Sequence, residues 1–334
     1  MFKLAFLWGD TLIEKPNRKG SILRIERASI HDGDGIRTVV YFKGCPLKCK
    51  WCSTPESQKT YEELAYMEKK CTRCERCVSH CPENALSLSS EDGKIHIDRS
   101  KCTRCFKCID TCPFGALRKY GISMSVDEVV NEISKDELFY FHSKGGVTIS
   151  GGECLMQMEF LRDILQGCKM NGINTAIETS LLAKYEDIEM VLPFIDTFFV
   201  DIKHMDSHCH KVLTGVKNHM ILDNIVKLDE SKFNFDIRVR IPIIPGLNDS
   251  EANLLATLEF CSNRNKISSI ELLPYHRYGI DTYNSLDIEY ELKKLSTPSN
   301  DHIIRMDSLL KERKSNLEIR ANVGVSGSST NLTI

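Results

Sequence analysis

Short apolar runs recur along the chain, and polar residues or glycines follow each of them. Runs of about four to eight apolar and β-branched residues are typical of buried strands. Longer segments with apolar residues at helical spacing separate these runs, which indicates strands that alternate with helices in a parallel sheet. The predicted strands are Thr38–Phe42, Gly146–Ser150, Asn174–Glu178, Thr197–Ile202, Ile237–Pro242 and Ser269–Pro274.

Two segments between the predicted strands have the features of helices. Met158–Lys169 places its apolar residues at helical spacing. Ser125, followed three residues later by Glu128 and then by valines, forms a capping box that predicts a helix start. In (β/α) barrels the active-site groups lie on the loops after the strands. The polar residues after the predicted strands are therefore candidate functional groups.

The cysteines are concentrated in one part of the chain. Eleven of the 15 cysteines lie between Cys45 and Cys112, in short-spaced clusters that indicate metal binding in a reducing compartment rather than a disulfide framework. The first cluster is Cys45-x3-Cys49-x2-Cys52. A closed metal site takes four protein ligands, whereas three cysteines leave one position open. A four-cysteine site that takes its last ligand from elsewhere in the chain is the alternative.

Two further clusters share the spacing C-x2-C-x2-C-x3-C-P, and the second copy begins 31 residues after the first. This is the pattern of bacterial two-cluster ferredoxins, in which the fourth cysteine of each run binds the other cluster. C-x2-C pairs also bind zinc, but three closely spaced cysteines before each Cys-Pro disfavour that interpretation. The predicted ligands are Cys71, Cys74, Cys77 and Cys112 for one cubane, and Cys102, Cys105, Cys108 and Cys81 for the other.

Composition and net charge bear on whether the protein binds nucleic acid or a membrane. The 334 residues are 42% hydrophobic and 27% charged, as in an ordinary globular protein, and the net charge is -2. This balance gives no reason to expect nucleic acid or a membrane as a partner. The apolar run Phe2–Trp8 is too short to span a bilayer, and it lacks the pattern of a secretory signal. We therefore expect a cytoplasmic protein with oxygen-sensitive clusters.

The first cysteine cluster resembles the signature of the radical S-adenosylmethionine superfamily. The resemblance implies a 4Fe-4S cluster held by Cys45, Cys49 and Cys52, which form the catalytic centre, with one free iron that binds S-adenosylmethionine. Reductive cleavage of that cofactor releases a 5′-deoxyadenosyl radical. The resemblance also implies a partial (β/α)6 TIM-like barrel, with the triplet after the first strand and an inserted α+β bacterial-type ferredoxin domain.

The expected domain organisation follows from this resemblance. The barrel would comprise residues 20–58 and 119–322, and the ferredoxin-like insert with its two clusters would comprise residues 59–118. Residues 1–19 would form an N-terminal extension, and residues 323–334, rich in glycine, serine and threonine, a disordered tail. Three 4Fe-4S clusters in total are expected, from the three groups of cysteines.

Two segments narrow the resemblance to the activating enzymes of glycyl radical enzymes. His31–Thr38 is similar to that family's His-Asp-Gly-Pro-Gly-Ile-Arg-Thr stretch, with Asp34 where the family has proline. Trp51–Ser57 is similar to its Trp-Cys-x-Asn-Pro-Glu-Ser stretch, with Thr54 in place of asparagine. In the family, the first of these loops lies near the substrate glycine. We expect Asp34 to make this loop more mobile and to meet a cationic group on the partner.

The resemblance implies an oxidoreductase of anaerobic metabolism that takes a hydrogen atom from a glycine Cα of its partner, a glycyl radical enzyme. Flavodoxin or ferredoxin would donate the electron. A radical enzyme that acts on a small molecule or a ribosomal peptide is one alternative, and an iron-sulfur electron-transfer protein is another. The His31–Thr38 stretch disfavours the first alternative, and a chain far longer than a two-cluster carrier needs disfavours the second.

The same resemblance implies a cofactor site. Ser150–Glu153 is similar to the motif that receives the amino group of the cofactor, since glycines permit close approach and a carboxylate pairs with an ammonium group. The carboxylates of Glu178 and Asp201 would hold a monovalent cation, and Cys154 is expected to pack. The expected cofactor contacts are Trp51, Cys52, Ser53, Gly151, Gly152, Glu153, Glu178, Asp201, Ile202, Lys203 and His276.

Overall fold

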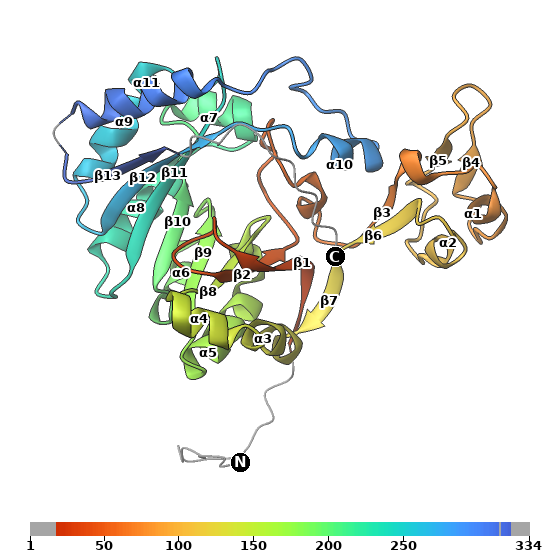
Figure 1. Ribbon diagram of the computed structural model, residues 1–334, viewed down its shortest axis with the longest axis horizontal. Coiled ribbons are helices and arrows are strands. Elements are labelled where there is room, and N and C mark those ends of the chain that lie inside the picture. Colours follow the sequence, from red (N-terminus) through yellow and green to blue (C-terminus); the bar gives the residue numbers. More distant parts are fainter. Residues whose placement is uncertain (1–17, 314, 322–334) are drawn as a thin grey trace, which may run out of the picture.

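A computed structural model describes residues 18–313 and 315–321, so the apolar run Phe2–Trp8 and the predicted tail lie outside the described residues. The described chain forms a large curved sheet with helices along its outer side, and a small unit projects from it (Figure 1). The strands of the large sheet lie in the order β13-β12-β11-β10-β9-β8-β2-β1-β7. Their bounds are β1 (Lys19–Ser29), β2 (Arg37–Phe42), β7 (Ile122–Ser125), β8 (Gly146–Gly151), β9 (Asn174–Thr179), β10 (Thr197–Asp201), β11 (Asp236–Ile243), β12 (Ile267–Pro274) and β13 (Glu318–Ala321).

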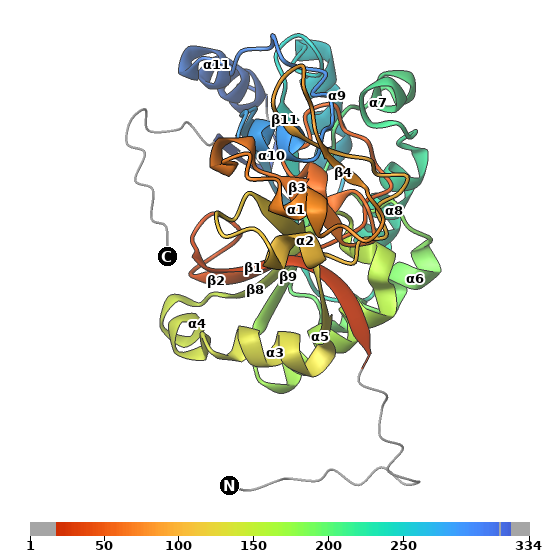
Figure 2. The same cartoon turned by 90° about the vertical axis from the view of Figure 1, so that its right-hand side faces the viewer.

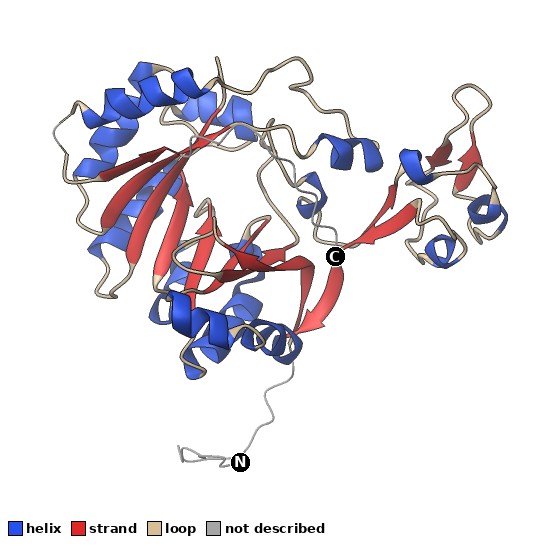
Figure 3. Cartoon of the chain, viewed as in Figure 1, coloured by secondary structure: helices blue, strands red, loops and turns tan. Residues whose placement is uncertain are grey.

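Helices follow most strands of the large sheet and cover its outer side (Figure 3). The predicted capping box is present, because the Ser125 hydroxyl accepts from the Glu128 amide and the Glu128 carboxylate accepts from the Ser125 amide. The predicted helix at residues 158–169 is confirmed to within one residue. In the described part of the chain, no helix combines the length and the apolar character that a membrane span requires. The helices outside the small unit are α3 (Val126–Ser134), α4 (Glu137–Ser143), α5 (Met158–Met170), α6 (Tyr185–Glu189), α7 (Ser207–Thr214), α8 (His219–Glu230), α9 (Glu251–Ser262), α10 (Ile280–Ser285) and α11 (Asn300–Lys311).

Neighbouring strands are parallel from β2 to β13, whereas β1 runs antiparallel to both β2 and β7 at the other end of the sheet. The six predicted strands are β2, β8, β9, β10, β11 and β12, and they lie side by side in chain order. An α/β fold with a parallel sheet is therefore confirmed. The strands β1, β7 and β13 were not predicted, because β7 and β13 are four residues long and β1 exposes several polar residues.

The two faces of the sheet differ in character because side chains alternate along each strand. On β11, the side chains of Ile237, Val239 and Ile241 are fully buried in the core between the sheet and the helices. Arg238 and Arg240 alternate with them and therefore lie on the opposite, inner face. The outer face forms the hydrophobic core, and the inner face carries polar and charged groups.

The small unit stands on a stalk of two antiparallel strands and has its own apolar core (Figure 1; the unit faces the viewer in Figure 2). Two cysteines, Cys77 and Cys108, are among the few members of that core. The elements of the unit are β3 (Glu63–Tyr66) and β6 (Leu117–Tyr120), which form the stalk, α1 (Arg76–Ser79), α2 (Lys107–Asp110), and the hairpin of β4 (Leu86–Leu88) and β5 (Ile95–Ile97).

We expect Leu161→Ala on α5 to lower the free energy of unfolding by about 2–5 kcal/mol, because the fully buried side chain would leave a cavity in the core. Met170, the last residue of the same helix, is 81% exposed. Met170→Ala is therefore the control and should change the free energy by less than about 0.5 kcal/mol. Anaerobic urea unfolding measures both, and equal shifts of the two midpoints would contradict the assignment of the buried helix face.

Candidate active site

The cysteine triplet lies on the loop that follows β2, at the carboxyl end of the parallel strands. Backbone hydrogen bonds hold this loop at two points. The Cys45 amide donates to the carbonyl of Gln58 at 3.0 Å, and the Lys48 amide donates to the carbonyl of Thr214, the last residue of α7, at 2.7 Å. The loop is therefore fixed against the segment after the triplet on one side and against α7 on the other.

The three cysteines of the triplet are half-buried free thiols. Burial raises the pKa of Cys45 and that of Cys49 to about 12, and the charge of Lys203 opposes the rise at Cys49. Metals bind the thiolate, so metal affinity at this loop depends on positive charge that compensates for burial. Three thiols on one short loop fit a cluster that keeps one iron free for another ligand.

The segment Ser150–Glu153, which contains Gly151 and Gly152, lies directly beside the triplet loop. The Gly152 amide donates to the carbonyl of Phe42 at 2.9 Å, and the Glu153 amide donates to the carbonyl of Gly44 at 2.7 Å. A Cβ atom on Gly152 would lie 2.2 Å from the Gly44 oxygen, and Gly151 has a φ angle of +109°. Close backbone approach within the protein itself therefore requires both glycines.

Glu153 is 1% exposed, and hydrogen-bond donors surround its carboxylate. It accepts from the Thr179 hydroxyl at 2.6 Å, and from the Ser180 amide and hydroxyl at 2.9 and 2.5 Å. Burial raises the pKa of Glu153, and the hydrogen bonds from Ser180 and Thr179 oppose that rise. We expected this carboxylate to pair with an ammonium group of the cofactor. In the structure it connects the turn after β8 to the end of β9, and Cys154 beside it is fully buried.

Asp201 and Lys203 form an ion pair at the end of β10, with 2.9 Å between Oδ2 and Nζ, and the Lys203 side chain is 11% exposed. Burial alone would lower the pKa of Lys203, but Asp201 and Cys49 outweigh burial and raise it. Ile202 is buried, and its amide donates to the carbonyl of Arg240 at 3.0 Å. This arrangement places a fixed positive charge near the triplet.

A charged network crosses the inner face of the sheet. Arg240 on β11 pairs with Glu178 on β9 and with Glu271 on β12, the latter at 2.9 Å. The Ser150 hydroxyl also donates to Glu178, and the Arg240 guanidinium lies 3.9 Å from the ring centroid of Phe199. Glu178, which we expected to share a monovalent cation with Asp201, therefore meets a cation that the chain itself provides.

Sequence reasoning missed the arginines of the inner face. Arg37, Arg238 and Arg240 were not singled out, although Arg37 is 2% exposed and donates to the Thr148 hydroxyl at 2.7 Å. The signal was available in Asp236–Ile243, where charged residues alternate with isoleucine and valine. A charge at every second position of a buried strand indicates a polar inner face.

The loop before β2 folds across this inner face. Asp34 forms a bidentate ion pair with Arg238, at 2.9 and 2.6 Å, and the Thr148 hydroxyl donates to the Asp32 carbonyl at 2.7 Å. The hydrogen bond from Arg238 lowers the pKa of Asp34, so the pair persists at neutral pH and is lost as the pH falls through that lowered pKa. The expectation that Asp34 loosens this loop and meets a cation of the partner is therefore corrected, because Arg238 of the same chain supplies the cation and restrains the loop.

The remaining predicted contacts lie around the triplet loop. Trp51 is buried in a second apolar cluster that also includes Tyr275. Ser53 is exposed, and its carbonyl oxygen lies 2.7 Å from the position of a Cβ atom on Gly279. His276 is exposed and stacks on the ring of Tyr278, with 4.5 Å between the centroids. The loops after β2 and β12 therefore approach each other closely.

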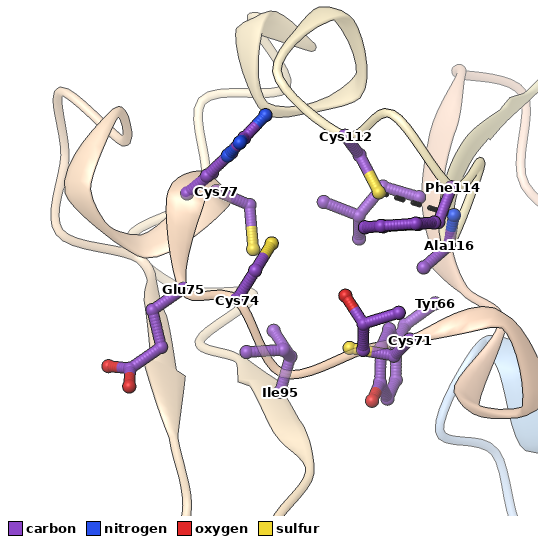
Figure 4. A pocket seen from close by; sticks show the side chains of 12 residues that line it. Tyr66, Cys71, Cys74, Glu75, Cys77, Ile95, Cys112, Phe114 and Ala116 are labelled. Atoms are coloured by element: carbon purple, nitrogen blue, oxygen red, sulfur yellow. Dashed lines mark hydrogen bonds between the residues drawn. The ribbon is translucent and has the colours of Figure 1, made fainter.

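The eight cysteines of the small unit line two pockets. Three cysteines of one run and the fourth cysteine of the other run surround each pocket, which is the crossed grouping that the sequence predicts. The space at the two pockets, part of it open to solvent, is about 340 and 330 Å³. The first is lined by Cys71, Cys74, Cys77 and Cys112 (Figure 4), and the second by Cys81, Cys102, Cys105 and Cys108.

The backbone around these pockets repeats with the sequence. Glu75 and Phe106 occupy equivalent positions, and both have φ and ψ angles of 58° and 7°. The amides of Ala85 and Ala116 both donate to the sulfur of the fourth cysteine in their run at 3.3 Å. Within the described residues, no group of three or more His, Cys, Asp or Glu side chains could hold a single metal ion. In a cubane each sulfur binds a different iron, so four separated sulfurs with amide donors fit a 4Fe-4S cluster.

Three family models match the chain. The Radical SAM superfamily matches residues 103–258, a 4Fe-4S dicluster domain matches residues 70–116, and a 4Fe-4S single cluster domain matches residues 31–91. The dicluster match spans the cysteines of both pockets, and the single-cluster match includes the triplet.

Curated proteins show the same relationship over most of the chain. The chain is 41% identical over 281 residues to a (2S)-3-sulfopropanediol dehydratase activating enzyme of Klebsiella oxytoca, covering 83% of this chain and 88% of that protein. It is 42% identical over 301 residues to a trans-4-hydroxy-L-proline dehydratase activating enzyme of Clostridioides difficile, covering 89% and 98%. A solved domain of a pyruvate-formate lyase-activating enzyme of Bacteroides vulgatus is 34% identical, with a TM-score of 0.44 and coverage of 53% of this chain and 98% of that domain.

The chain is thus a radical S-adenosylmethionine enzyme with additional iron-sulfur domains. Within that class, it belongs to the family of activating enzymes of glycyl radical enzymes.

We expect Glu153→Gln to lower the free energy of unfolding by about 1–3 kcal/mol, because the new amide group would face donors and leave at least one of them without an acceptor. Glu186→Gln, on the exposed side of α6, is the matched control and should have almost no effect. Anaerobic urea unfolding compares the two variants. A loss no larger than that of the control would show that the carboxylate does not connect the two strand ends.

Proposed function

We propose that this protein activates a glycyl radical enzyme by reductive cleavage of S-adenosylmethionine. When bound, the cluster and S-adenosylmethionine supply a 5′-deoxyadenosyl radical that takes the hydrogen atom from a glycine Cα of the partner. One observation carries the proposal. The three thiols of the triplet, the tightly packed Gly151–Gly152 and the Asp201–Lys203 pair all lie at the carboxyl edge of the parallel strands, where such sheets place their active sites.

The residues of this edge have separate tasks in the proposal. Cys45, Cys49 and Cys52 hold the cluster and leave one iron free. The Lys203 ammonium, oriented by Asp201, provides positive charge for the anionic groups of the site. The glycines bring backbone atoms close to the cofactor. The further proposed contacts are Trp51, Ser53, Glu153, Glu178, Ile202 and His276, with a monovalent cation at Glu178 and Asp201.

We infer that the curved sheet is a partial (β/α)6 barrel, formed by residues 20–58 and 119–322, and that residues 59–118 are a ferredoxin-like insert. The stalk of β3 and β6, the separate core and the two four-cysteine pockets support this division. With the triplet, the two pockets give three 4Fe-4S clusters. The proposed ligands of the insert are the eight cysteines that line its pockets.

The proposed partner is a glycyl radical enzyme, and reduced flavodoxin or ferredoxin is the proposed electron donor. Relatives named as activating enzymes of dehydratases, lyases and decarboxylases match this chain at similar identity, between 36% and 43%. That uniform likeness indicates activation machinery common to these relatives. We place the reaction in an anaerobic cytoplasm, where reduced iron-sulfur clusters persist.

Replacement of Cys45, Cys49 and Cys52 by alanine should remove about four of about twelve irons and abolish S-adenosylmethionine cleavage. The expectation follows from the three-thiol loop. Cys209→Ala, at a half-buried cysteine on α7, is the control and should change neither quantity. Iron analysis and 5′-deoxyadenosine formation are the measurements. Cleavage retained in the triple variant would refute the assignment, and about eight irons in the unmodified protein would favour an electron carrier.

The ion pair between Asp34 and Arg238 restrains the loop before β2. Asp34→Ala should lower the glycyl radical yield on the partner several-fold, because it removes the ion pair that holds the loop. Asp34→Pro should keep a yield closer to the unmodified protein, because the ring restrains φ in place of the ion pair. Both variants should cleave S-adenosylmethionine normally without the partner, since the cofactor residues lie on other loops.

Electron paramagnetic resonance of the activated partner measures the radical in this experiment. The partner in the assay is a glycyl radical enzyme that the unmodified protein activates. Equal yields from Asp34→Ala and the unmodified protein would show that the loop position does not affect hydrogen transfer.

A further inference from the structure

Lys43, two residues before the triplet, is a buried charge to which the proposed mechanism assigns no task. Its side chain is 0% exposed. Its backbone directly follows β2 and is held against β1 and the segment before α5, because the Lys43 amide donates to the Ser21 carbonyl and the Gln157 side chain donates to the Lys43 carbonyl, each at 3.0 Å. A buried ammonium group is costly unless it is paired, so the identity of its partners is informative.

The Lys43 ammonium lies where the two strands of the stalk meet the rest of the chain, at the start of β3 and the end of β6. Nζ donates to the Glu56 carbonyl and lies 3.4 Å from Oε2 of Glu63, the first residue of β3. Glu63 is 3% exposed and is the register partner of Tyr120, the last residue of β6. A Cβ atom on Gly121, the next residue, would lie 2.5 Å from Cδ of Lys43. One side chain, directly after the end of β2, therefore contacts both sides of the stalk.

Other polar contacts between the small unit and the rest of the chain lie nearer the surface. Arg99 donates to the carbonyl of Leu286 at 2.7 Å in a part-buried contact. Lys69 and Asp281 pair at 3.3 Å, but their side chains are 86% and 74% exposed. Ion pairs in solvent contribute little to structure, whereas loss of one partner of a buried pair is costly. The Lys43–Glu63 pair is thus well placed to fix the stalk.

We propose that Lys43 is a positioning residue that fixes the stalk, and with it the two four-cysteine pockets, at a set distance from the cysteine triplet. The inference rests on the proposed function, because it takes these pockets and the triplet as the iron-sulfur sites. The same backbone carries Lys43 and Cys45, so the stalk is held by the segment that presents the triplet. A set distance matters because electron transfer between iron-sulfur centres weakens steeply as their separation grows.

The test measures hydrogen exchange of the stalk amides at residues 63–66 and 117–120 in the cluster-loaded protein. Lys43→Met and Glu63→Gln each break the buried pair, and each should raise the exchange rate of the stalk about tenfold or more. Peptides of β8 and β9 should keep their exchange rates. Lys69→Met is the control, because Lys69 also links the small unit to the rest of the chain, through Asp281 at 3.3 Å, but its side chain is 86% exposed. It should change the exchange of the stalk by less than about twofold.

A second measurement distinguishes positioning from local packing. In the fully reduced protein, electron paramagnetic resonance reports the spin-spin interaction between the triplet cluster and those of the small unit, which depends on their distance. This interaction should weaken in Lys43→Met and Glu63→Gln at unchanged iron content, and stay unchanged in Lys69→Met.

The outcomes decide the proposal in either direction. Unchanged stalk exchange in both buried-pair variants overturns it, as does faster exchange with an unchanged spin-spin interaction. Faster exchange together with a weaker interaction supports it. If Lys43→Met does not fold, Glu63→Gln, which keeps the shape of the side chain, decides alone. Neither measurement uses S-adenosylmethionine or the partner, so a failure here is distinguishable from a failure of the proposed activity.

Discussion

Two backbone hydrogen bonds between the end of β2 and the turn after β8 hold the candidate site together. They run from the amides of Gly152 and Glu153 to the carbonyls of Phe42 and Gly44. Because of these bonds, the triplet loop and the turn after β8 form one rigid unit, and neither changes position without the other. The Glu153 carboxylate then connects this rigid unit to β9 through Thr179. The site is therefore built on the ends of strands, which hold functional groups more accurately than free loops do.

Glu153 also has an architectural role, because it connects neighbouring strand ends within the protein. A buried carboxylate is tolerated only when donors satisfy it. Here the neighbouring strand supplies those donors from Thr179 and Ser180. The glycines before Glu153 have a similar explanation, since a side chain on Gly152 would collide with the triplet loop. Gly152 and Glu153 thus both satisfy the packing of neighbouring strand ends.

The sequence predicted those parts of the fold whose signals are local. The six predicted parallel strands and the helix α5 have continuous or periodic apolar residues, and the cysteine pockets follow from strict spacing. The ion pairs could not be predicted in the same way. Asp34 and Arg238 are 204 positions apart, and only the order and register of the strands bring them together. The isolated Lys43 also gave no signal, because its burial depends on a stalk that begins at Glu63.

The core of the small unit has a consequence for how the protein is made. That core contains few apolar side chains, and Cys77 and Cys108 are among them. Residues such as Glu75 and Phe106 also hold left-handed backbone conformations that cost free energy. A unit with so small a core has little stability of its own, so metal bound by its cysteines would stabilise the folded form. In a cell short of iron, or exposed to air, newly made chains would have a folded large sheet and an unfolded small unit. Proteases would remove such chains, and the supply of competent activator would follow the supply of iron.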